Sequence, residues 1–74
     1  MTPPITAADV PDKWISDVQD AMKQGHYLLR AGPDSTIHVG SVGSPWMVLM
    51  LPGSGTTFAT AAERNTVLRK LLEL

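Results

Sequence analysis

Trp46-Met47-Val48-Leu49-Met50-Leu51 is the most apolar run of the chain, and it lies between Pro45 and the turn sequence Pro-Gly-Ser-Gly at 52–55. Six apolar residues bounded by proline and glycine are too few for a helix, but they have the length of a strand buried on both faces. The run therefore predicts a strand, and we expect it to be a central strand of a small sheet.

The chain has 74 residues and no cysteine. A single small domain must then be held together by its hydrophobic core, because disulfides and thiolate metal sites are excluded. No run approaches the roughly 18 apolar residues of a membrane span, and the N-terminus lacks the pattern of a signal peptide. We therefore expect a soluble cytoplasmic protein without membrane contact. We also expect a flexible tail over residues 1–8, one domain over residues 9–74, and no cofactor or metal.

Two helices are predicted, one at each end of the domain. The first is indicated by apolar residues at helical spacing and is expected over 11–24, with Asp9 or Thr6 as its cap and Gly25 as the left-handed residue that stops it. The second is expected over 61–73. It follows the sequence Thr-Ala-Ala-Glu at 60–63, which has the form of a capping box, in which the threonine hydroxyl and the glutamate carboxylate satisfy exposed N–H groups.

Between the helices the apolar residues recur with a period of two. Residues 26–31 and 36–39 alternate on either side of a turn at 32–35, so they predict a hairpin that pairs antiparallel with the run 46–51. The stretch 56–59 is expected to be a loop. The order is thus α-β-β-β-α, an α+β fold in which two helices pack on one face of a three-stranded antiparallel sheet.

The predicted core combines the apolar stripes of both helices with the inward residues of the strands. It comprises Trp14, Ile15, Val18, Met22, Tyr27, Leu29, Ile37, Val39, Met47, Leu49, Leu51, Val67, Leu68, Leu71 and Leu72. Alternation then points every second residue of the apolar run outward, where a one-sided sheet normally presents polar residues to water. We therefore predict a protein interface on the open face of the sheet, formed by Leu28, Trp46, Val48 and Met50.

Two motifs that suggest chemistry are weak. The turn at 52–55 has the glycines of a phosphate-binding loop, but that loop needs a glycine where Met50 stands and a lysine where Thr56 stands, so no nucleotide is expected. His26 and His38 are too few for a metal site. In the predicted hairpin they lie on the same face and could be cross-strand neighbours, either as surface polar residues or as a pH-sensitive or RNA-contacting pair.

Three segments, 25–30, 49–52 and 67–72, together resemble the HicA family of small mRNA-cleaving toxins in their order and approximate spacing. The resemblance covers residues 25–74 and implies a fold similar to the double-stranded RNA-binding domain. Members of the HicA family have a catalytic histidine in a Gly-Ser-His motif at the start of the second strand. The resemblance places Ser35 or Thr36 of this chain at the position of that histidine. A catalytic role would therefore depend on His38, which lies later.

Three functions remain open: a non-catalytic interaction or regulatory module, a HicA-like ribonuclease, and a non-enzymatic RNA-binding or DNA-binding protein. The formal net charge of −1 argues against the second and the third, since nucleic-acid-binding domains usually display a concentrated basic face. We favour the first, acting as a homodimer or with a protein partner. Contacts to nucleic acid, if formed, would come from His26, Arg30, His38, Arg64, Arg69 and Lys70.

Overall fold

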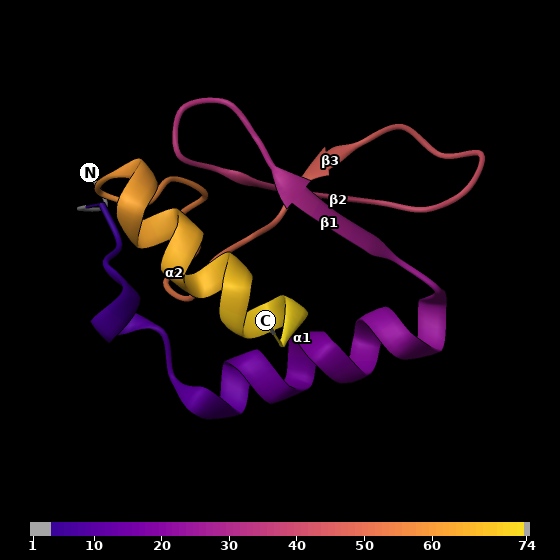
Figure 1. Ribbon diagram of the computed structural model, residues 1–74, viewed down its shortest axis with the longest axis horizontal. Helices are drawn as coiled ribbons and strands as arrows, with labels where there is room; N and C mark the ends of the chain where they lie inside the picture. Colours follow the sequence, from indigo (N-terminus) through magenta and orange to yellow (C-terminus); the bar gives the residue numbers. More distant parts are fainter. Residues whose placement is uncertain (1–3, 74) are drawn as a thin grey trace.

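The computed structural model describes residues 4–73 and has the predicted element order (Figure 1). A short 3-10 helix, η1, precedes five main elements. Their bounds are η1 Ala7–Asp9, α1 Asp12–Gly25, β1 Leu28–Ala31, β2 Ile37–Gly40, β3 Met47–Val48 and α2 Ala61–Leu72. The strands form one antiparallel sheet, so the α+β class and the α-β-β-β-α order are confirmed.

Both helices lie within one residue of their predicted bounds, but the residues that begin and stop α1 differ from those predicted. Pro11 is its N-cap residue, while Thr6 and Asp9 belong to η1 instead. The left-handed residue at its C-terminal end is His26, with φ 54°, and Gly25 is still helical. A β-carbon at Gly25 would overlap the ring of Tyr27, so any larger residue there would require this ring to move.

The capping box of α2 forms only in part. The Thr60 hydroxyl accepts a hydrogen bond from the backbone N–H of Glu63 at 3.2 Å, as predicted. The Glu63 carboxylate does not return to the cap and accepts instead from the backbone N–H of Ala7 at 2.8 Å. A charge-assisted hydrogen bond to the backbone is stronger than a neutral one, so this contact fastens the N-terminal segment to α2.

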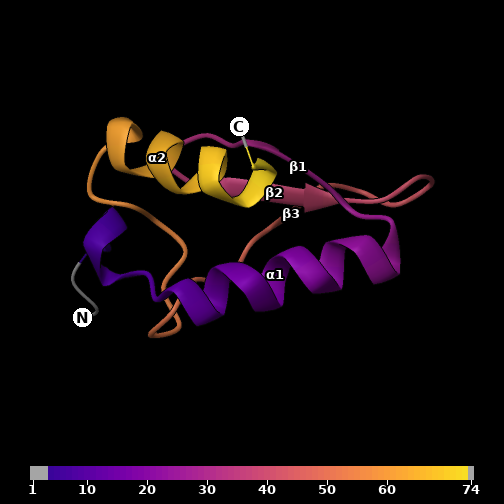
Figure 2. The ribbon, with the colours of Figure 1, turned by 60° about the horizontal axis from the view of Figure 1, so that its bottom comes forward.

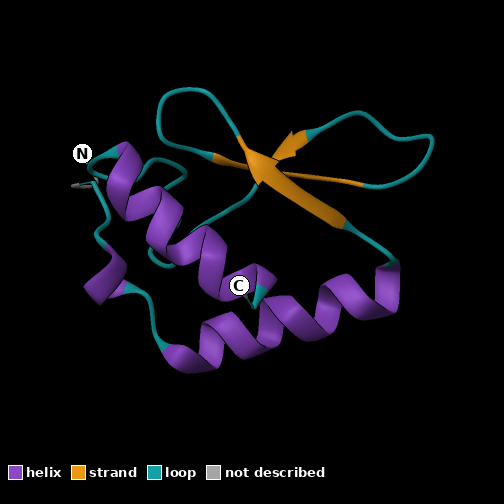
Figure 3. Ribbon diagram, viewed as in Figure 1, coloured by secondary structure: helices purple, strands orange, loops and turns teal. Residues whose placement is uncertain are grey.

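The apolar run 46–51 is the element that differs most from its prediction. Only Met47–Val48 is a strand, and the sheet order β1-β2-β3 places it at an edge, with β2 in the centre. The backbone N–H of Leu49 donates to Ile37 at 2.8 Å and prolongs the pairing by one residue. Beyond it, Leu51 donates to Gly55 and closes the next turn. Figure 3 shows how short the strands are beside the loops that join them.

The strand register assigns side chains to two faces of the sheet. Leu29 lies opposite Val39, which lies opposite Met47, and with Ala31, Ile37 and Leu49 these residues define the inner face. Arg30 lies opposite His38, which lies opposite Val48, and with Leu28 and Gly40 they define the outer face. Alternation within the predicted strands is therefore correct, although the third strand is short.

The buried core includes three residues outside the predicted set: Ile5, Val10 and Phe58. Phe58 is 1% exposed and is the largest fully buried side chain. It pairs with Ile5 in a parallel bridge, and its backbone N–H donates to Ser35 at 3.0 Å. The predicted tail 1–8 thus contributes a core residue at Ile5, and its residues 1–3 lie outside the described part of the chain.

Three predicted core residues are exposed instead: Met47 at 67%, Tyr27 at 44% and Leu72 at 38%. The arrangement of the helices explains the first two. α2 packs against β1 and α1 packs against α2, so the sheet receives its main helical contact from α2. In Figure 2 α1 runs below both the strands and α2. The packing of both helices on one face of the sheet stays a prediction.

Candidate functional site

We call the predicted interface residues the outer patch: Leu28 and Val48 lie on the outer face of the sheet, Trp46 contacts Arg30 on that face, and Met50 follows β3 in the chain. Its members Leu28, Trp46, Val48 and Met50 are 58%, 38%, 46% and 59% exposed. Burying apolar surface of this kind is favourable by about 25 cal/mol for each Å². Contiguous exposed apolar surface on a small domain is a mark of an interaction site, whereas single exposed apolar residues are ordinary.

Two polar side chains lie between the members of the outer patch. The guanidinium carbon of Arg30 stands 4.2 Å from the ring centroid of Trp46, a cation–π contact. Arg30 Nη2 also donates to Nδ1 of His38, on the neighbouring strand, at 3.4 Å. The Trp46 ring in turn covers Gly40, where a β-carbon would come within 2.9 Å of it. Arg30 thus contacts Trp46 through its guanidinium and His38 through a hydrogen bond, and the three residues come from three adjacent segments of the sheet.

This arrangement corrects the predicted histidine pair. The strand register places Arg30, not His26, opposite His38. His26 is exposed at the C-terminal end of α1, before β1 begins. The alternation of the hairpin agrees with the prediction, but the register that pairs Leu28 with Gly40 would place position 26 opposite position 42 even in a longer strand, so the two histidines do not face each other.

The predicted nucleic-acid contacts do not gather on one surface. Arg30 and His38 lie on the outer face, whereas Arg69 and Lys70 are exposed in the last turn of α2. Arg64 is engaged inside the fold: its Nη1 donates to the carbonyl oxygens of Gly32 at 2.8 Å and Thr36 at 3.0 Å. Arg64 therefore joins α2 to the β1–β2 turn.

Replacing Arg64 with methionine is expected to lower the free energy of unfolding by about 1 to 3 kcal/mol, because two part-buried carbonyl groups lose a charged donor. Arg69→Met, on the exposed side of the same helix, is the matched control and should change it by less than about 0.5 kcal/mol. Urea unfolding followed by circular dichroism measures both. Equal stability of the two variants would show that the Arg64 hydrogen bonds contribute nothing.

The residues needed for catalysis or metal binding are sparse. Within residues 4–73 no three histidine, aspartate or glutamate side chains are close enough to hold a metal ion. In the same range the side chain of His38 is hydrogen-bonded to Arg30, which cannot orient the imidazole as a carboxylate would. Asp9 belongs to η1. The pKa of its carboxyl group is held below the ordinary value because the carboxylate accepts hydrogen bonds from the backbone N–H and the hydroxyl of Thr6.

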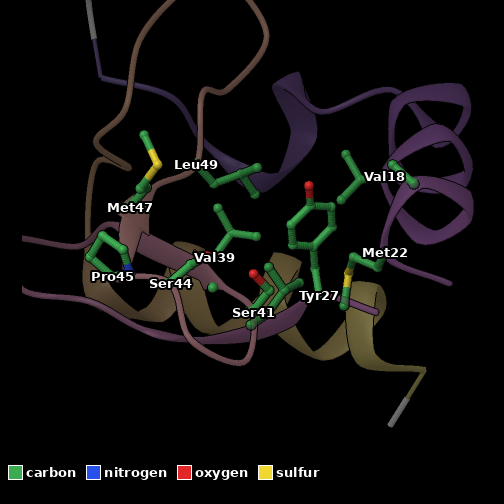
Figure 4. A pocket seen from close by; sticks show the side chains of 12 residues that line it. Val18, Met22, Tyr27, Val39, Ser41, Ser44, Pro45, Met47 and Leu49 are labelled. Atoms are coloured by element: carbon green, nitrogen blue, oxygen red, sulfur yellow. The ribbon is translucent and has the colours of Figure 1, made fainter. Parts of the chain in front are cut away.

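A second apolar feature is a groove of about 430 Å³ between α1 and the inner face of the sheet. Figure 4 shows side chains from α1, from the strands and from the 41–46 loop around it. Its lining comprises Val18, Ala21, Met22, Tyr27, Leu29, Val39, Gly40, Ser41, Ser44, Pro45, Met47 and Leu49. Seven of the predicted core residues thus line an open hollow, because α1 does not close over this end of the sheet.

No helix between residues 4 and 73 is long and apolar enough to cross a membrane. Two apolar features make up the candidate site. The first is the outer patch, with Arg30 against Trp46, on one face of the sheet, and the second is the groove beneath the other face. Comparison of the chain with models of protein families, with curated proteins and with solved structures found no match.

Proposed function

We propose that this chain is a small non-catalytic interaction module that acts through the outer patch, as a homodimer or with a protein partner. The observation that carries the proposal is the exposure of the four large apolar side chains Leu28, Trp46, Val48 and Met50. A face that met only water would place polar side chains at these positions. Tryptophan, methionine and arginine are also enriched in protein interfaces.

The composition of the rest of the chain agrees with this function. A domain of 74 residues has a small core. Within the described part of the chain eight hydrophobic residues are buried: Ile5, Val10, Ile15, Ile37, Leu51, Phe58, Val67 and Leu71. An interface that buries the outer patch would add stability, because a partner that binds only the folded state shifts the folding equilibrium.

Val48→Glu is expected to weaken association at least tenfold, since it places a charge where apolar surface must be desolvated. The side chain is half exposed on an edge strand, so the free energy of unfolding should change by about 1 kcal/mol or less. Sedimentation velocity measures self-association, and retention of lysate proteins on the immobilised chain measures partner binding.

Val42→Glu is the matched control, because Val42 is 96% exposed in the 41–46 loop and lies outside the outer patch. It should associate as the wild type does. The proposal fails if the wild-type chain is monomeric at high concentration and retains no protein that Val48→Glu loses. It also fails if both valine variants lose binding equally, since the effect would then come from added charge alone.

A further inference from the structure

The positively charged side chain of Arg30 lies among the members of the outer patch. Arg30 stacks on Trp46 at 4.2 Å and is tied to His38 by one hydrogen bond, while its side chain is exposed. A guanidinium has five N–H donors in a fixed fork, so most of them remain open to a ligand. The contact with the indole restricts the movement of the Arg30 side chain, which lowers the conformational entropy lost when a second group binds it.

The described part of the chain does not supply an anion for this cation. Within residues 4–73 Arg30 forms no ion pair, and the ion pair in this range, between Lys13 and Asp17, lies on the surface of α1. No strand residue on the outer face is acidic. The acidic residue nearest in the hairpin is Asp34, which lies in the turn beyond the end of β1.

A second copy of the chain is a poor occupant of this face. A two-fold interface presents the same surface from both subunits, so each Arg30 would approach a face that holds arginine and histidine but no carboxylate. Nucleic acid is also a poor occupant. Arg30 is the only arginine or lysine on the described outer face, Arg64 is engaged inside the fold, and Arg69 and Lys70 lie on α2.

We propose that the outer patch binds a different protein, through a segment that presents one carboxylate surrounded by apolar side chains. The carboxylate binds the guanidinium fork of Arg30, and the apolar side chains cover Leu28, Trp46, Val48 and Met50. Bidentate arginine–carboxylate pairs combine charge with fixed geometry. This inference rests on the proposed function and specifies the chemistry of its partner.

The test is a selection of random twelve-residue peptides, displayed on phage, against the immobilised full chain. Peptides that bind wild type are expected to share an aspartate or glutamate flanked by apolar residues. Synthetic copies should bind Arg30→Gln at least tenfold more weakly, because the charge-assisted hydrogen bonds are lost. Arg30→Lys should restore part of the affinity, and selection against Arg30→Glu should yield peptides with lysine or arginine at the same place.

Two controls separate this inference from the proposed function. Arg69→Gln removes an exposed arginine from α2 and should bind the selected peptides as wild type does. Val48→Glu should lose them, which shows that they occupy the outer patch. Circular dichroism confirms that every variant is folded, as expected for substitutions of exposed side chains.

Peptides that depend on Val48 but lack an acidic residue, and that bind Arg30→Gln normally, would overturn the inference and leave the proposed function standing. So would a wild-type dimer that Val48→Glu dissociates, since the occupant would then be a second copy. Salt-sensitive retention of single-stranded RNA that Arg30→Gln abolishes would overturn it in favour of nucleic acid. No Val48-dependent peptide and no dimer would overturn both proposals.

Discussion

Replacing Phe58 with alanine is expected to lower the free energy of unfolding by about 3 to 5 kcal/mol, which would leave much of the chain unfolded at 37 °C. Phe58 is 1% exposed and belongs to the same buried cluster as Ile5, Ile37 and Val67. Its backbone donates to Ser35 on the β1–β2 turn and bridges Ile5. Phe58 therefore lies in a cluster to which the N-terminal segment, the hairpin and α2 all contribute, and removal of its side chain opens a cavity there.

Tyr27→Ala is the matched control, because it also truncates an aromatic ring but at a position that is 44% exposed. Its cost should be about 1 kcal/mol, in proportion to the smaller area that it buries. Urea unfolding of the two variants gives both values. If Tyr27→Ala destabilised the chain as much as Phe58→Ala, the core would lie at the C-terminal end of α1 and not around the bridge between Ile5 and Phe58.

The order of elements and the bounds of both helices could be predicted because they depend on local periodicity. The apolar stripe of α1 and the sequence around Thr60 mark their helices without reference to the rest of the chain. Phe58 could not be placed in this way. It is a single aromatic residue among small and polar neighbours, and its burial is decided by Ile5, more than fifty residues earlier.

The outer patch could be predicted from the alternation of two strands, and its four members are exposed. The stacking of Arg30 on Trp46 was missed, because it joins residues on the two outer strand segments across β2. The signal was available in the register: His38 faces Arg30 on one side and Val48 on the other. Arg64 was assigned to a surface because no local pattern reveals a bond to a distant turn.

The second large effect is expected at Ile37, where substitution by alanine should lower the free energy of unfolding by about 2 to 5 kcal/mol. Ile37 is fully buried at 0% exposure on the central strand. Because β1 and β3 both pair with β2, the surroundings of Ile37 cannot easily collapse into the space that the side chain leaves. Thermal and urea unfolding measure the loss.

Leu49→Ala is the matched control, since it removes the same number of carbon atoms from the neighbouring strand segment on the same inner face. The apolar run predicts that Leu49 is central, but in the structure it is half-buried and lines the groove beside α1. Leu49→Ala should therefore lower the free energy of unfolding by half as much as Ile37→Ala does, or by about 1 to 2 kcal/mol. Equal costs for the two variants would mean that α1 closes over the inner face in solution. The groove would then be absent, and both helices would pack on one face of the sheet.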